Sequence, residues 1–235
     1  MCVSVSSLKM RELGLVKFGL RLHPLEYWAL GNGKVVIGVD EVGRGSAFGP
    51  LVLAAFKLDW EIVDLVGNHP MAGKIADSKK LDHKTRARIF RHILYRERAW
   101  FVDGISNITI DKVGLGRAVL DFLPGFISRA LEYLGVERNQ AIIVLDGERA
   151  LYYYGEESKI HYKRADSDFL SVALASIVAK YLRDYVLIKK YHHRARKYGI
   201  KNHKGYLTEV HRQAILRFGV LPEHRKSYLQ DLMSI

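Results

Sequence analysis

The stretch IGVDEVGRGSAFGP, from Ile37 to Pro50, decides how the rest of the chain is interpreted. The apolar residues that lead into it predict a buried strand. This strand carries two adjacent acids, Asp40 and Glu41, and a glycine–arginine–glycine turn follows them. Glycine tolerates positive φ and has no Cβ, so the backbone of such a turn can come close to a ligand. The stretch therefore predicts two carboxylates beside a turn whose arginine and amides can bind phosphate.

A purely structural explanation fits the same residues, namely a hairpin with a solvated acidic pair and glycines that only the turn requires. The positions of the two acids also set a condition on any shared site. Adjacent strand residues point to opposite faces of a sheet, so Asp40 and Glu41 can reach one site only if the strand ends or bulges there. We expect that it does, with the help of Gly43.

Composition limits the class of protein. The chain has 235 residues, enough for one substantial core, and 49% of them are hydrophobic, as in an ordinary globular protein. Its formal net charge of +12 favours a polyanionic partner, nucleic acid above all, although a basic surface that binds nothing would give the same sum. The single cysteine, Cys2, allows no internal disulfide, and no apolar run approaches the ~20 residues of a membrane span. We expect a cytoplasmic protein without a membrane segment.

Hydrophobic patterns predict the main elements. Strands are expected at residues 35–41, 50–58, 99–107, 141–145 and 160–165. Helices are expected at residues 82–98, 166–191 and 208–218, with a further helical segment at 108–134 that Pro124–Gly125 divides into two. The mixture of strands and helices predicts an α/β fold.

Two further acids stand where a site could form. Asp146 ends the apolar run AIIVL and is followed by glycine, and the carboxyl end of a buried strand is a common place for a ligand. Asp166 opens the long helix of residues 166–191. Each has an ordinary structural explanation as well: a strand-end turn for Asp146 and a helix cap for Asp166.

Further short motifs follow in order. They are Asp77-Ser78-Lys79-Lys80-Leu81, Ala165-Asp166 with Ala175-Ser176-Ile177-Val178-Ala179-Lys180 and Arg183-Asp184, His203-Lys204-Gly205-Tyr206, and His224-Arg225-Lys226-Ser227-Tyr228. Together with the opening stretch they resemble the ribonuclease HII family over residues 35–228. The chain departs from that family's pattern at Ser46, where proline is usual, and at Phe48, where a small residue is usual.

The resemblance implies an RNase H-like fold: a mixed sheet, with its first three strands antiparallel, flanked by helices and followed by a helical C-terminal part. It implies a catalytic domain at residues 35–235 behind an N-terminal arm at residues 1–34. It also implies an endonuclease that cuts the RNA strand of RNA–DNA hybrids, including the 5′ side of single ribonucleotides embedded in DNA, and that leaves 5′-phosphate and 3′-hydroxyl ends.

The resemblance assigns catalysis and metal binding to four acids and not to Asp168 or Asp184. These four are Asp40, Glu41, Asp146 and Asp166. Four converging carboxylates are costly unless cations neutralise them, and hard oxygen ligands suit Mg²⁺ or Mn²⁺. Two such ions could clamp an in-line displacement at phosphorus.

Residues for substrate binding follow from the same motifs. They are Gly43, Arg44, Gly45, Ser78, Lys79, Lys80, Lys204 and Tyr206. In the family, the glycine–arginine–glycine turn and the tyrosine read the 2′-hydroxyl at an RNA–DNA junction. The expected partner is a hybrid, or a DNA duplex with an embedded ribonucleotide, bound by a monomer. Two alternatives stay open: a basic nucleic-acid-binding protein without catalysis, and a two-metal nuclease that acts on other DNA or RNA.

Overall fold

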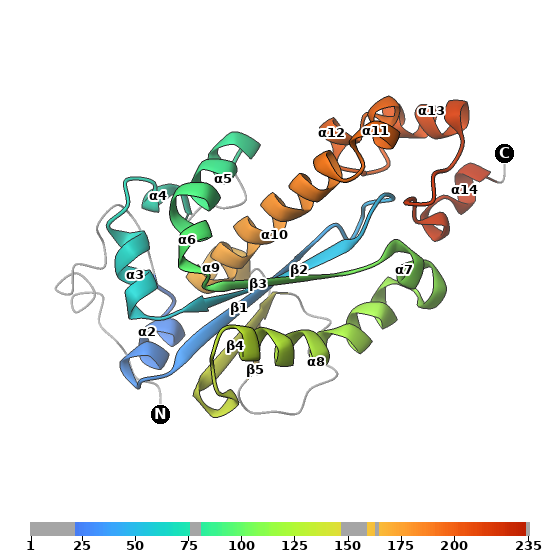
Figure 1. The fold of residues 1–235 in the computed structure, drawn as a ribbon. Coiled ribbons are helices and arrows are strands. Elements are labelled where there is room, and N and C mark those ends of the chain that lie inside the picture. Colours follow the sequence, from blue (N-terminus) through green and yellow to red (C-terminus); the bar gives the residue numbers. More distant parts are fainter. Residues whose placement is uncertain (1–21, 76–80, 147–158, 163–164, 234–235) are drawn as a thin grey trace. The chain divides into compact units, whose positions relative to one another are not determined.

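The structure is a computed structural model that describes residues 22–75, 81–146, 159–162 and 165–233 (Figure 1). Five strands form one sheet in the order β3-β2-β1-β4-β5. Their bounds are β1 (Val35–Val42), β2 (Leu51–Leu58), β3 (Trp100–Ile105), β4 (Ala141–Asp146) and β5 (Lys159–Tyr162).

The sheet is mixed. Strand β4 pairs in parallel with β1 on one side and with β5 on the other. Strands β2 and β3 are antiparallel, because Lys57 at the end of β2 donates its N–H to Ala99, just before β3, at 2.7 Å. Strands β1 and β2 are neighbours joined by residues 43–50, too short a link for a parallel crossover. The expected fold class, a mixed sheet flanked by helices, is confirmed.

The helices of the described residues are α2 (Pro24–Gly31), α3 (Trp60–Gly67), α4 (Ala72–Ile75), α5 (His83–Ile89), α6 (Tyr95–Glu97), α7 (Asn107–Val113), α8 (Leu115–Tyr133), α9 (Ala165–Asp168), α10 (Leu170–Lys189), α11 (His192–Ala195), α12 (Ile200–His203), α13 (Glu209–Phe218) and α14 (Gln230–Met233). Side-chain oxygens begin several of them: Asp82 accepts the N–H of Thr85 at 2.7 Å, as expected for a cap. None of these helices is long and apolar enough to cross a membrane.

The chain divides into two compact units. The first unit comprises Met1–Asp40, Ala54–Val102 and Ile127–Val178, and the second comprises Glu41–Leu53, Asp103–Phe126 and Ala179–Ile235. In the first unit, the last turns of α8 and the first turns of α10 lie on opposite sides of the strands (Figure 1). The second unit has an apolar core of its own, which includes Phe48, Leu187 and Tyr198.

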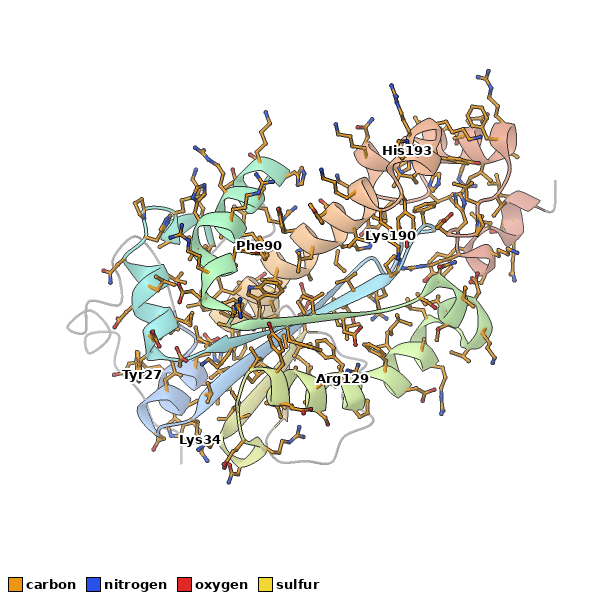
Figure 2. The ribbon with its side chains drawn as sticks, viewed as in Figure 1. Tyr27, Lys34, Phe90, Arg129, Lys190 and His193 are labelled. Atoms are coloured by element: carbon orange, nitrogen blue, oxygen red, sulfur yellow. The ribbon has the colours of Figure 1, made fainter. Side chains whose placement is uncertain are left out.

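A buried carboxylate ties α2 to α10 in the first unit. Glu26 is fully buried, and its two oxygens accept the backbone N–H groups of Leu170 at 3.1 Å and Ser171 at 2.8 Å. These amides lack partners at the start of any helix, and the helix dipole favours a negative charge there. Burial raises the pKa of Glu26, and the hydrogen bonds oppose that rise. Tyr27 of α2, labelled in Figure 2, packs edge-on against Trp60 of α3, so α2 also contacts α3.

The predicted break at Pro124–Gly125 is wrong. The helical segment divides at Gly114 instead, where φ is +80°, and Pro124 lies inside α8. Proline removes one backbone hydrogen bond from a helix interior, at a cost of about 3 kcal/mol. The buried side chains on either side, Leu123, Phe126 and Ile127, keep the helix continuous by packing into the interior.

Candidate active site

Two of the predicted acids follow directly on the last residue pair of two neighbouring strands. In the parallel ladder of β1 and β4, Val39 lies opposite Leu145, so the next residues, Asp40 and Asp146, finish the ladder side by side. Asp40 is buried, with 8% of its surface exposed, and Asp146 is half-buried. Most of the apolar residues before them are buried, which explains why both chain segments form central strands.

A third acid joins them from helix α9. The N–H of Ala165 donates to Oδ1 of Asp146 at 2.8 Å, which brings the start of α9 to the end of β4. Asp166 is the next residue and is 6% exposed, whereas Asp168 is exposed. The structure therefore brings together Asp40, Asp146 and the backbone that carries Asp166, and it separates Asp168 from them by burial.

A glycine on β1 allows this approach. A Cβ built on Gly38 would stand 2.2 Å from the carbonyl carbon of Ser171 and 2.4 Å from the nitrogen of Val172, both in the first turn of α10. Residues two apart on a strand share a face, so Gly38 and Asp40 face the side on which α10 begins. Glycine at this position lets the helix lie directly on the strand, and the helix carries Asp166 at its entry.

Glu41 behaves differently from the other three acids. Strand β1 runs on to Val42, so it does not end at the acidic pair, and the expected alternative of a bulge there stays a prediction. Glu41 begins the second unit, and its carboxylate pairs with the guanidinium of Arg44. Within the described ranges, no three His, Cys, Asp or Glu side chains form a group that could hold a metal ion as they stand. The assignment of Glu41 and of the metal ligands stays a prediction.

The glycine–arginine–glycine turn lies in the second unit over a buried arginine. Gly43 has φ +98°, and a Cβ there would be 2.4 Å from Nε of Arg183. Both the backbone conformation and the lack of space therefore favour glycine at this position. Arg183 is 1% exposed and donates to the carbonyl oxygens of Phe48 at 3.0 Å, Pro50 at 3.1 Å and Lys204 at 3.1 Å. Burial, and after it the charge of Arg225, lowers the pKa of Arg183 to about 10.

Tyr206 lies beside this turn. A Cβ on Gly45 would stand 3.6 Å from the Tyr206 ring, and Ser46 and Tyr206 form an isolated antiparallel bridge. The tyrosine is 43% exposed, so its ring is available to a ligand. Lys204 lies nearby in the sequence with its ammonium 3.7 Å from Asp184. The five predicted substrate-binding residues that the structure describes, Gly43, Arg44, Gly45, Lys204 and Tyr206, are thus near one another, whereas Ser78, Lys79 and Lys80 lie outside the described residues.

The two departures from the family pattern are accommodated locally. The hydroxyl of Ser46 donates to the carbonyl of Phe48 at 2.9 Å and accepts the Phe48 N–H at 3.3 Å, so it closes the turn that proline would otherwise stiffen. Phe48 is fully buried and packs edge-on against Tyr191 and His224. A large residue is tolerated at this position because the core of the second unit takes up its ring.

A pair of buried histidines fixes the backbone of Tyr206. The Leu221 N–H donates to Nδ1 of His224 at 2.8 Å, so the proton of that ring is on Nε2. Nε2 of His224 lies 3.1 Å from Nε2 of His211, whose Nδ1 lies 3.0 Å from the carbonyl oxygen of Tyr206. The chain of hydrogen bonds is complete only when both rings are neutral. Burial lowers the pKa of His211 and of His224 to about 4.

We expect this pair to make the fold sensitive to acid. In the unfolded chain both histidines titrate near 6.5, and in the fold near 4, so stability is fully present above about pH 6.5 and falls as the pH drops towards 4. The loss at pH 5 is about 2 kcal/mol for each histidine. Urea unfolding between pH 8 and pH 5 measures it. His193→Gln, at an exposed position (Figure 2), should leave the curve unchanged, and a flat wild-type curve would contradict the prediction.

Sequence reasoning missed Arg183 and His211 as parts of the site. Arg183 was noticed only as one letter of a motif, and His211 stands in an unremarkable amphipathic helix. A signal for Arg183 was its place among small and apolar residues on the buried face of a long helix, where an arginine needs partners. The sequence offered no comparable signal for His211.

Comparison with known proteins identifies the family. The family model described as Ribonuclease HII matches residues 37–230. A curated relative from Frankia alni, named Ribonuclease HII, is 35% identical over 194 residues, which is 83% of this chain and 75% of the relative.

Solved structures support the fold. The ribonuclease H2 of Pyrococcus horikoshii OT3 matches with a TM-score of 0.62 and 21% identity, over 85% of this chain and 97% of that one. Bst-RNase HIII, solved in complex with Mn²⁺, matches with a TM-score of 0.57 and 20% identity, over 88% and 73% of the two chains. With the family model spanning most of the sequence, the chain belongs to the ribonuclease HII family of metal-dependent endoribonucleases.

Proposed function

We propose that this protein hydrolyses the RNA strand of RNA–DNA hybrids and also cuts on the 5′ side of single ribonucleotides embedded in DNA, leaving 5′-phosphate and 3′-hydroxyl ends. The observation that carries the proposal is the meeting of Asp40, Asp146 and the Asp166 backbone at the carboxyl ends of two parallel strands. The net charge of +12 supports a polyanionic substrate.

The donor set fits hard divalent cations. Three aspartates offer only oxygen ligands, and the two that are buried gain most from a cation that neutralises them. Asp40, Asp146 and Asp166, with Glu41 as the fourth acid, would hold Mg²⁺ or Mn²⁺. The chemistry that a bound pair of ions supplies is activation of a water and stabilisation of the leaving oxygen in an in-line displacement.

The remaining candidates would bind and orient the nucleic acid. The Gly43–Gly45 turn and Tyr206 would contact the ribose at the junction, since a backbone without a Cβ can reach a 2′-hydroxyl that a side chain would block. Phosphates would be contacted by Lys204, Arg44 and the residues Ser78, Lys79 and Lys80, and such contacts position the duplex without reading its sequence. We propose further that the protein works as a cytoplasmic monomer, with residues 1–34 as an arm on the catalytic domain of residues 35–235.

A substrate panel tests the proposal. We expect Mg²⁺- or Mn²⁺-dependent nicking of a hybrid duplex and of a DNA duplex with one ribonucleotide, no cutting of plain duplex DNA, and no activity with a chelator. End-labelled products would show a 3′-hydroxyl on the upstream fragment. Binding to the hybrid without nicking would favour a non-catalytic binding protein, and equal cutting of plain duplex DNA would favour a nuclease of other specificity.

A further inference from the structure

Side chains of the C-terminal segment His224–Tyr228 form hydrogen bonds to the backbone of the glycine–arginine–glycine turn within the second unit. Nη1 of Arg225 donates to the carbonyl oxygen of Gly43 at 2.7 Å and to that of Arg44 at 3.1 Å. The hydroxyl of Tyr228 donates to the same Arg44 oxygen at 2.8 Å. Two side chains from the far end of the sequence thus hold two consecutive carbonyl groups of this turn.

These hydrogen bonds determine the direction in which the amide N–H groups of the turn point. The structure has no cis peptide bonds among its described residues, and in a trans peptide the N–H points away from the C=O of the same unit. Because the carbonyls of Gly43 and Arg44 are held by the protein, the N–H groups of Arg44 and Gly45 point to the opposite side. Two successive outward amides are a donor pair suited to an oxygen of a ribose or phosphate.

The segment that holds the turn is itself anchored by hydrogen bonds to Asp111. Asp111 accepts the N–H groups of Lys226 and Ser227, both at 2.9 Å, and the Ser227 hydroxyl at 2.6 Å. Burial alone would raise the pKa of Asp111, but the hydrogen bonds from Ser227 and Lys226 lower it below its ordinary value. The Arg225 guanidinium lies over the Tyr228 ring, 5.3 Å from its centroid. This cation–π contact stabilises the positions of both side chains that hold the turn.

Fold stability alone is a weak reason for this arrangement. Arg225 is fully buried, and its guanidinium donates to the peptide oxygens of Gly43, Arg44 and, at 3.1 Å, Gly49. Burying a guanidinium without a carboxylate to hydrogen-bond it costs free energy that an apolar side chain would not. The cost is understandable if the orientation of the turn matters for ligand binding.

We propose that Arg225 and Tyr228 are positioning residues that fix the Gly43–Gly45 turn for recognition of the 2′-hydroxyl of a single ribonucleotide. The inference rests on the proposed function. A single embedded ribonucleotide differs from plain DNA by one hydroxyl, so its recognition depends on the few groups that contact this hydroxyl, the turn among them. A continuous hybrid offers many 2′-hydroxyls and an A-like shape, so its binding is shared among many contacts. Loosening the turn therefore weakens cleavage of the first substrate more than of the second.

Tyr228→Phe tests this because it removes one hydrogen bond and keeps the ring beneath Arg225. The matched control is Tyr198→Phe, which removes a buried hydroxyl that donates to the carbonyls of Phe218 at 3.1 Å and Gly219 at 2.9 Å in the same unit. The kcat/KM values are measured on a duplex with one ribonucleotide and on a continuous hybrid of equal length, with Mg²⁺ and with Mn²⁺. Urea unfolding reports stability for all three proteins.

For Tyr228→Phe we expect the ratio of single-ribonucleotide to hybrid kcat/KM to fall about tenfold, mostly through KM, the effect of one well-placed hydrogen bond. Tyr198→Phe should lose comparable stability and keep the wild-type ratio. If Tyr228→Phe keeps the ratio, or if both variants lower it equally, the positioning role is overturned while the proposed function stands. If the wild type cuts neither substrate with either metal, the proposed function itself fails.

Discussion

Asp146→Asn is expected to fold like the wild type and to lose at least about a thousandfold in metal-dependent cleavage. Asparagine keeps an Oδ1 that can accept the Ala165 N–H, so the link between β4 and α9 survives. It replaces the other carboxylate oxygen by an NH₂ group, which cannot bind a cation. Mutation of a residue that only supports a metal ligand costs about 10–100-fold, so loss of a ligand should cost more. Single-turnover cleavage of a hybrid measures the loss, and the melting temperature reports the fold.

The control for this prediction is Asp168→Asn. It removes an exposed carboxylate from the same short helix as Asp166, with the same change of charge as Asp146→Asn. We expect near wild-type cleavage from this variant. Near wild-type cleavage by Asp146→Asn would contradict the assignment of Asp146, and an equal loss in Asp168→Asn would show that the loss is not specific to Asp146.

Gly38→Ala is expected to destabilise the protein by about 3 kcal/mol and to reduce cleavage at temperatures where the variant is still folded. The new methyl group would meet backbone atoms of Ser171 and Val172, which cannot rotate away as a side chain can. Over-packing of a close contact costs about 1–3 kcal/mol, and an obstacle made of backbone atoms places this case at the upper end. A shift of this size lowers the Tm by about 10 °C. Activity falls as well, because α10 must move and its entry carries Asp166.

Gly116→Ala provides the comparison. Gly116 lies in α8, and a Cβ there would meet nothing within 4 Å. Alanine favours a helix over glycine by up to about 1 kcal/mol, so this variant should be as stable as the wild type or slightly more so. Equal losses of stability in the two variants would contradict a specific close approach at Gly38. Differential scanning calorimetry and hybrid cleavage at 25 °C measure both effects.

Much of the sheet could be predicted from the sequence because its pattern is local. The apolar runs before Asp40 and before Asp146 had the length and composition of buried strands, and each acid marked a strand end or came close to it. The continuation of β1 through Val42 was not predictable, because backbone pairing with a neighbouring strand decides where a strand stops. The position of the helix break was predicted wrongly for a related reason. Proline at position 124 is unfavourable locally, and burial of its neighbours, a property of the folded chain, outweighs it.

The candidate site was predicted unevenly. Carboxylates are rare at the ends of buried strands, so the sequence marks them clearly. The support beneath the turn was not marked, since it consists of bonds from Arg183 and Arg225 to backbone oxygens. Hydrogen bonds to a peptide carbonyl can be made to any residue type and leave no trace in the partner's identity.

The buried Arg225 beneath the turn has a further consequence for how the amides of the turn bind. A cation that attracts electrons towards a carbonyl oxygen polarises the whole peptide group, so the N–H on the other side becomes a stronger donor. Arg225 holds the carbonyls of Gly43 and Arg44, whose peptide groups carry the N–H of Arg44 and that of Gly45. The acidity of the outward amides is therefore set from the interior. A survey of surface residues would consider only the charge of Arg44 at this turn. It would overlook the buried charge of Arg225, which strengthens the binding of an anion by the turn.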